Sequence, residues 1–108
     1  MSTNQVSTAL GALSDPTRRA IFERLFAGPS SVGDLANEFP VSRPAVSQHL
    51  RVLKDAGLVV DHADGTRRVY QVHPPTVEAV RAYFDRFWSL NLSSFKQAAE
   101  KRSRKTHG

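Results

Sequence analysis

The chain has 108 residues, of which 40% are hydrophobic and 23% charged, and these proportions are typical of one soluble globular domain. It has no cysteine, which excludes disulfides, thiolate metal sites and thiol redox switches, and no apolar run near the roughly 18 residues of a membrane span. The net charge of +5 favours polyanionic partners, but residues 100–108, with four basic residues and one acidic residue, supply +3 of it. What matters is therefore where the fold places its cations.

Two helices are predicted at the beginning of the chain. The opening MSTNQVSTAL lacks the basic start and apolar middle of a signal peptide, so we expect a cytoplasmic protein. The first helix, over 5–13, is uncharged and carries Val6 and Leu10 on a side that is expected to meet another helix. The second begins at Asp15-Pro16, because Asp accepts from orphan N–H groups and Pro suits the first helical position, and it runs to about residue 27.

Two more short helices joined by a tight turn follow. Ser31 and Asp34 resemble a capping box that opens the third helix, and Pro40 ends it. Ser42 caps the fourth helix, which Gly57 closes. This arrangement predicts a helix-turn-helix.

The fourth helix has two unlike sides. Val46, Leu50 and Leu53 are spaced by four and three residues and mark a side that packs inward. The opposite side contains no carboxylate before Asp55, whereas a helix built only for solubility would mix both signs of charge there. This side is expected to meet an anion.

A β-hairpin is predicted next. LVVDHA and TRRVYQV are rich in β-branched residues and flank the turn dipeptide Asp64-Gly65. A two-residue turn at that dipeptide places Asp61 opposite Arg68 and Val59 opposite Tyr70.

A long last helix is predicted from Pro74-Pro75 to about Ala99. Its apolar stripe is wider than one small core needs, so we expect it to form a dimer interface, although such a stripe can also line a ligand pocket. The predicted interface residues on this helix are Phe84, Phe87, Trp88, Leu92 and Phe95. Residues 1–99 are expected to form the domain, and 100–108 a basic disordered tail that adds non-specific electrostatic attraction.

These pieces resemble a known family. LSDPTRRAIFERL, VSRPAVSQHLRVLKDAGLV and FWSLNLSSF are similar to segments of the ArsR-type bacterial transcriptional repressors, over roughly residues 9–95 and most specifically over 42–59. The resemblance implies a mainly α winged helix-turn-helix of about five helices with a two-stranded antiparallel wing. It also implies a homodimer held by the first and last helices, which adds Val6 and Leu10 to the predicted interface residues. The fourth helix is then expected in the DNA major groove and the wing along the backbone.

Roles for single residues follow from how groove helices read DNA, since side chains of the first turns contact base edges. We expect Arg43, Ser47, Gln48 and Arg51 to read bases, beside Pro44 in the first turn. Ser42, Lys54, Thr66, Arg67 and Arg68 are expected to contact phosphates, which position the protein without specifying sequence. For Arg68 a cross-strand pair with Asp61 is the alternative.

Three residues have open interpretations. His49 lies between the two sides of the fourth helix, and a hydrogen bond within the module is favoured over a DNA or switch contact. Arg18 and Arg19 follow a helix start, where cations gain nothing from the helix dipole, so a solvated face or a local salt bridge is favoured over a phosphate contact.

The metal sites of the family do not carry over. The cysteine site is absent, and the last predicted helix has Glu78 and Asp85 but no histidine, so no metal and no cofactor is expected. The effector is unknown: a small molecule, a partner, or the protein's own concentration would each serve.

Other classes of function are less well supported. No G-x-S-x-G elbow, P-loop or H-E-x-x-H motif indicates an enzyme. A protein-interaction module without DNA binding would have lost its basic helix, which this chain keeps. The expected function is a homodimeric repressor that binds a palindromic DNA operator, with control of its own gene as an open option.

Overall fold

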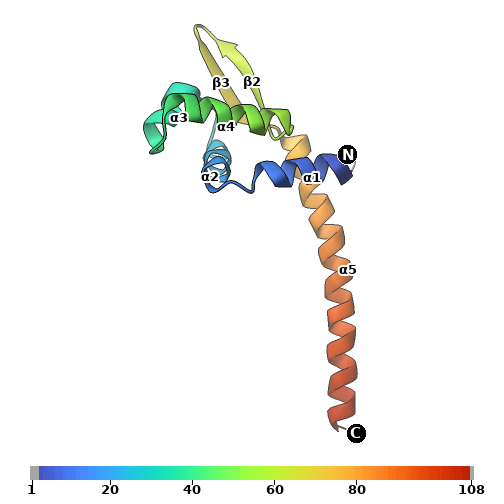
Figure 1. The fold of residues 1–108 in the computed structure, drawn as a ribbon. Coiled ribbons are helices and arrows are strands. Elements are labelled where there is room, and N and C mark those ends of the chain that lie inside the picture. The colour runs from blue at the N-terminus through green and yellow to red at the C-terminus, as the bar shows by residue number, and fades with distance from the viewer. Residues whose placement is uncertain (1–2, 108) are drawn as a thin grey trace.

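The computed structural model describes the backbone of residues 3–107 and the side chains of residues 4–90, 92 and 94–102. Figure 1 shows the helices of the N-terminal half packed together, a hairpin projecting from them, and one long helix leading away. The elements in chain order are α1 (Thr3–Ala12), α2 (Pro16–Leu25), β1 (Ser30–Ser31), α3 (Val32–Glu38), α4 (Arg43–Asp55), β2 (Val59–Asp64), β3 (Arg67–Val72) and α5 (Pro74–His107). The expected fold class is confirmed, with one additional short strand.

Three predicted helix starts are present, and each is capped by a side chain that accepts a hydrogen bond from a backbone N–H of the first turn. Asp15 Oδ2 accepts from the backbone N–H of Arg18 at 2.8 Å before α2. Ser31 Oγ and Ser42 Oγ each accept, at 3.2 Å, from the N–H three residues further on, before α3 and α4. These caps satisfy N–H groups that have no partner inside the helix, which is why the helices begin at these residues.

Arg18 and Arg19 bind the end of α1. Arg18 Nε donates to the carbonyl of Ala12 at 2.5 Å, and an Arg19 guanidinium nitrogen donates to the carbonyl of Leu13 at 3.1 Å. The solvated face is confirmed for Arg19, which is exposed, whereas Arg18 is half-buried, and neither forms an ion pair with a described residue. Both cations also stabilise the negative end of the preceding helix through its carbonyls, which the sequence did not indicate.

The core surrounds the inward side of α4. Val46, Leu50 and Leu53 are fully buried, as their spacing predicted, and Ile21 of α2 and Leu35 of α3 are equally covered. Burial of such side chains contributes about 1.5–3 kcal/mol each relative to exposure. The core therefore fixes α4 from the inside and leaves its other side free.

The sheet has three antiparallel strands in the order β1-β3-β2. β1, which the sequence did not predict, pairs Ser30 with Tyr70 and Ser31 with Val69. It joins the start of α3 to the hairpin, so residues near positions 31–34 lie beside β3.

The hairpin register differs from the predicted one. Asp61 is opposite Tyr70, not Arg68, and Val59 is opposite Val72. The turn is Gly65-Thr66 because Gly65 has a φ of +64° and no non-glycine residue among those described has a positive φ. Either common hairpin turn centred on Asp64-Gly65 would need a positive φ at Asp64, whereas a type II′ turn at Gly65-Thr66 needs it only at Gly65.

α5 is longer than predicted. It continues through residue 107 instead of ending near Ala99, so the expected disordered tail is wrong for the backbone of residues 100–107, whereas the side chains of residues 103–108 lie outside the described ones. The segment after residue 75 has no Pro or Gly before 108, and residues 96–105 are all strong helix formers except Ser103.

Most of α5 extends beyond the body of the molecule. The chain measures 72 × 29 × 21 Å and its radius of gyration is 19.4 Å, against about 13 Å for a compact domain of this size. α1 crosses the beginning of α5, and beyond that crossing Figure 1 shows the helix alone. Val6, predicted for the dimer interface, is only 5% exposed, so this single chain already covers it.

Candidate nucleic-acid interface

The outer side of α4 forms one continuous exposed surface. Pro44, Ser47, Gln48 and Arg51, which we call the reading face, are all exposed and line a shallow concavity together with Lys54, Asp55 and Tyr70. The structure thus brings together four residues that the sequence singled out. Helical spacing explains this, because residues three and four apart share a side.

Arg43, the first residue of α4, faces the hairpin instead of the concavity of the reading face. It lines a second concavity with Thr66, Arg67 and Arg68 and with the start of α3. Its guanidinium lies beside Gly33, about 3.8 Å from where a Cβ on that residue would be, which is an ordinary contact distance. Arg43 and Gln48 therefore belong to neighbouring parts of one surface rather than to one concavity.

The hairpin of β2 and β3, which we call the wing, holds its arginines in ion pairs. One Arg67 guanidinium nitrogen donates to both Asp34 Oδ2 and Ser31 Oγ at 2.5 Å. This contact holds the pKa of Asp34 below its ordinary value, chiefly through the hydrogen bond from Arg67. The sequence could not indicate the pair, because the two residues are 33 positions apart and meet only through the unpredicted strand β1.

Asp61 receives two cations from two elements. Lys54 Nζ of α4 lies 2.8 Å from its Oδ1, and Arg68 Nε of β3 donates to its Oδ2 at 2.6 Å. The side chain of Asp61 is 7% exposed, while Lys54 and Arg68 remain about half exposed. Hydrogen bonds from Lys54 and then Arg68 hold the pKa of Asp61 below its ordinary value, so the carboxylate is charged at neutral pH.

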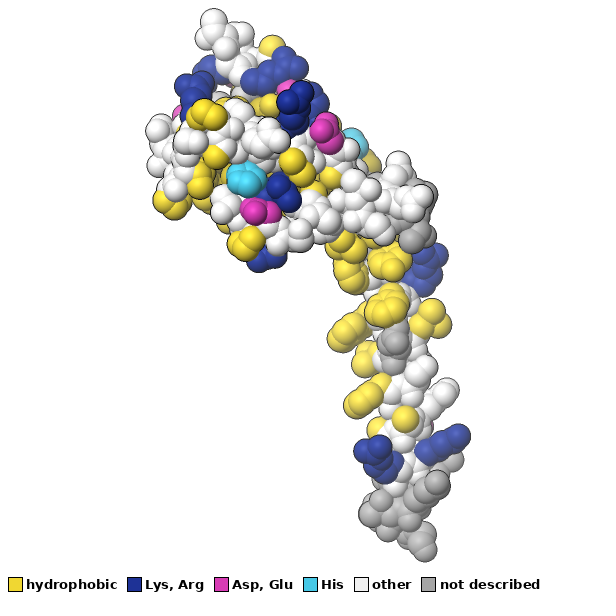
Figure 2. All heavy atoms as spheres, viewed as in Figure 1, with side chains coloured by type: hydrophobic (Ala, Val, Ile, Leu, Met, Phe, Trp, Pro, Cys, Tyr) yellow, Lys and Arg dark blue, Asp and Glu magenta, His cyan; other side chains and the backbone are white. Residues whose placement is uncertain are grey.

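Two predicted contacts have no such pairing. Arg43 and Arg51 are exposed and form no ion pair with any residue that the structure describes. Of the five cations predicted to contact DNA, these two are therefore available without first leaving a carboxylate. Figure 2 shows Lys and Arg side chains gathered near the wing end of the molecule.

His49 does not form the hydrogen bond expected of it. It is half-buried on α4, and its Nδ1 is covered but has no hydrogen-bond partner among the described residues. The nearby Asp15 has a pKa below its ordinary value, first because of the N–H of Arg18 and to a lesser extent through attraction to His49. His49 therefore packs behind the reading face rather than belonging to it.

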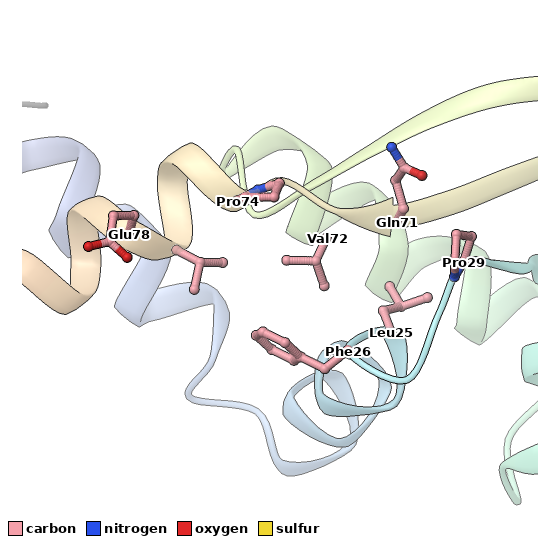
Figure 3. Close-up of a pocket in the computed structure, with 8 residues that line it drawn as sticks. Leu25, Phe26, Pro29, Gln71, Val72, Pro74 and Glu78 are labelled. Carbon is pink, nitrogen blue, oxygen red and sulfur yellow. The ribbon is translucent and has the colours of Figure 1, made fainter.

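A third concavity lies away from the reading face. Figure 3 shows Phe26 and Val72 among the side chains around it, with Glu78 at the α5 end, where Arg81 binds its carboxylate at 2.7 Å. The lining from α2, β3 and α5 is mainly apolar. Nothing in it adds to the cationic surface near the wing.

The exposed part of α5 carries large apolar side chains. Phe84, Phe87, Trp88, Leu92 and Phe95, which we call the α5 apolar face, are all exposed, with Trp88 at 65% and Phe95 at 71%. Figure 2 shows this apolar surface along the helix. A contiguous apolar surface of this kind marks a protein or ligand contact.

The described residues hold neither a cluster of metal ligands nor a membrane-spanning helix. In the part of the chain that the structure describes, no three His, Asp or Glu side chains gather as metal ligands would. Within the same residues, no helix is long and apolar enough to cross a membrane.

The helix-turn-helix with its exposed cationic side and the adjoining wing define a winged helix-turn-helix protein of the kind that binds DNA. A family model described as a helix-turn-helix domain matches residues 13–62. The chain is 59% identical to the HTH-type transcriptional regulator Rv2034 of Mycobacterium tuberculosis over 86 aligned residues, and the alignment covers 80% of each chain. It is 33% identical over 85 residues to the arsenical resistance operon repressor of Staphylococcus xylosus, covering 79% of this chain and 82% of that one.

Solved structures agree. An ArsR family transcriptional regulator matches with a TM-score of 0.75 at 32% identity, over 86% of this chain and 96% of that chain. A homodimeric winged helix-turn-helix DNA-binding domain from Mycobacterium bovis matches with a TM-score of 0.66 at 26% identity, over 74% and 75% of the two chains. This chain belongs to the ArsR family of helix-turn-helix transcriptional regulators, as the sequence resemblance implied, and it is a DNA-binding regulator.

Proposed function

We propose that two copies of this chain associate through α5 and repress transcription by binding a palindromic operator, with the promoter of its own gene as the first candidate. The reading face carries this proposal. It presents Ser47, Gln48 and Arg51 to solvent on a helix whose other side is fixed in the core. A rigid helix that displays donors and acceptors without carboxylates suits the major groove.

Dimerisation is supported by the α5 apolar face, which one chain leaves uncovered. The same face on a second copy offers a matching surface, as a two-fold interface requires. The Mycobacterium bovis relative is a homodimer, which supports the same assembly here. A two-fold dimer would present its two reading faces to half-sites about one helical turn, ~34 Å, apart.

The contacts divide into two kinds. Gln48 can pair bidentately with adenine and Arg43 with guanine, so these two side chains are proposed to read sequence. The wing residues Arg67 and Arg68, with Lys54, are proposed to contact phosphates. Each of these three must give up or share a carboxylate as it does so. Occupation of the operator would then block RNA polymerase, consistent with the repressor among the relatives.

The test is fluorescence anisotropy with the DNA upstream of the gene and a scrambled duplex, each at two salt concentrations. Gln48→Ala and Arg43→Ala should each cost about 1–3 kcal/mol on the operator and leave scrambled binding unchanged. Arg67→Ala should weaken both and lower the salt slope by about one unit per half-site. Gln97→Ala, an exposed glutamine on α5, is the control.

Two results would contradict the proposal. Wild-type protein that bound both duplexes equally, with all binding lost at the higher salt, would show no reading of this DNA sequence. If Gln48→Ala, Arg43→Ala and Arg67→Ala all acted uniformly on both duplexes, the division between base and phosphate contacts would be wrong.

A further inference from the structure

The carboxylate of Asp61 connects the wing to α4 at the point where the hairpin leaves the core. Along β2, Val59 is buried, Val60 and Asp61 are half-buried, and residues 62–64 are exposed. Asp61 is thus the last residue of β2 that is not fully exposed. Its bond to Lys54 crosses from the wing to α4, and its bond to Arg68 lies within the wing, between β2 and β3.

We propose that Asp61 is a positioning residue that fixes the wing relative to α4, so that Lys54 and Arg68 are presented to DNA together and the reading face is held in register. This inference rests on the proposed binding of an operator. It assigns to an acidic residue, which should by its charge repel DNA, a contribution to sequence discrimination.

The geometry requires a charged carboxylate at this position. Its two oxygens each accept from a different cation, so the pair of bonds needs two acceptors on one side chain. Asparagine has the same shape but only one acceptor oxygen, and its NH₂ group would face one of the two cations. Replacement by asparagine therefore leaves one cation without a partner and removes the attraction that holds both.

The environment strengthens these bonds. The side chain of Asp61 is 7% exposed because the two cations cover it, and hydrogen bonds between ions are stronger than those between neutral groups. The lowered pKa of Asp61 agrees with a carboxylate that remains ionised at neutral pH. Lys54 and Arg68 keep about half of their side chains exposed, so both can reach a phosphate while Asp61 orients them.

Asp64 provides a matched control. It lies on the same strand, carries the same charge and forms no ion pair with any described residue. Asp64→Asn removes one negative charge from the wing without releasing a cation. Differences between Asp61→Asn and Asp64→Asn therefore report on the two bonds and not on charge.

The experiment has one arm without DNA. Amide hydrogen exchange is followed over residues 59–72 in the wild-type protein and in both variants. Asp61→Asn should exchange faster there, while Asp64→Asn should match the wild type away from the turn. Equal exchange in the two variants would overturn the proposal, and it would do so whether or not an operator had been found.

The second arm uses a duplex that the wild-type protein recovers from a randomised pool and a scrambled version of it. Both variants should bind the scrambled duplex somewhat more tightly, since each loses a negative charge. Only Asp61→Asn should lower the ratio of operator to scrambled affinity, by about tenfold, the order of one lost base contact. A ratio equal to that of Asp64→Asn would refute the positioning role.

A fold defect in Asp61→Asn would not end the test. Lys54→Gln, Arg68→Gln and the double variant address the same junction from the other side. If the two cations acted only as independent phosphate contacts, neither would change the affinity ratio, and that result would overturn the proposal. If one carboxylate holds both cations, Lys54→Gln and Arg68→Gln should each lower the ratio of operator to scrambled affinity. The double variant should then lower this ratio by a smaller factor than the product of the two single-variant factors. Wild-type protein that enriched no duplex would instead refute the proposed function, and the exchange arm would still decide whether Asp61 fixes the wing.

Discussion

Substitution of Trp88 by alanine tests the proposed assembly most directly. The residue is 65% exposed, so of about 250 Å² for a tryptophan roughly 160 Å² is left for a partner to cover. At about 25 cal/mol per Å², covering half to all of that area contributes about 2–4 kcal/mol per protomer. A two-fold interface counts the contribution twice, which gives about 4–8 kcal/mol for the dimer.

Relaxation of the remaining side chains recovers part of this loss, so the lower value is the better expectation. It corresponds to a roughly thousandfold weaker dimer, since each 1.4 kcal/mol is about a factor of ten. Sedimentation velocity or light scattering over a dilution series measures the shift directly. Operator affinity should fall as well, because a monomer loses the advantage of two linked half-sites.

Leu90→Ala is the matched control for this change. Leu90 is 67% exposed on the same helix, and it lies well round the helix from Phe84, Trp88 and Phe95, although it borders Phe87 three residues before it. Its replacement should weaken the dimer much less than that of Trp88. If Leu90→Ala weakened the dimer as much as Trp88→Ala, or if Trp88→Ala dissociated at the same concentration as the wild type, the α5 apolar face would not be the interface.

Three further predictions concern stability. Gly57 has a φ of +78° and a Cβ there would lie 3.4 Å from Thr76 Oγ1, so Gly57→Ala should lower the free energy of unfolding by about 1–2 kcal/mol in urea titrations. Gly11→Ala, in open space on α1, should not lower it and should raise it by up to about 1 kcal/mol, and a similar loss in both variants would refute the backbone argument. The pKa of Asp61 is lower in the folded state than in the unfolded state, so the carboxylate adds to the free energy of unfolding above the unfolded pKa, and this addition is lost as pH falls through the folded pKa. In thermal melts below about pH 4, the midpoint temperature should therefore fall less in Asp61→Asn than in the wild type. Leu50→Ala should cost about 2–5 kcal/mol in the same titrations, and a loss below 1 kcal/mol would contradict its fully buried position.

The sequence predicted the helices and the reading face because both depend on local patterns. Ser31 and Ser42 cap the helices that follow them, and the inward side of α4 follows from the spacing of its apolar residues. Such features need only neighbours within a few positions. They also place Ser47, Gln48 and Arg51 on one surface without knowledge of the rest of the fold.

Features that depend on distant contacts were not predictable in the same way. The pairs of Arg67 with Asp34 and of Lys54 with Asp61 require the sheet to form, and β1 is too short to leave a strand pattern in the sequence. The hairpin turn was misplaced by one residue because a glycine suits either central position of a hairpin turn. Each residue of β2 is therefore opposite a residue two positions further along β3 than predicted. A shift of two residues keeps every side chain on its predicted side of the hairpin, which is why Asp61 still meets Arg68, now diagonally.

The length of α5 beyond the body links folding to abundance. At 34 residues it spans about 51 Å, and most of that length extends beyond the body of its own chain (Figure 1). A helix without tertiary contacts is marginal in water, so in the proposed dimer the distal turns would depend on the second copy for their stability. Freshly made protein at low concentration would therefore present unprotected backbone to proteases, while protein above the dimerisation threshold would be protected. The same helix would then set a minimum cellular level below which the regulator is degraded rather than merely inactive.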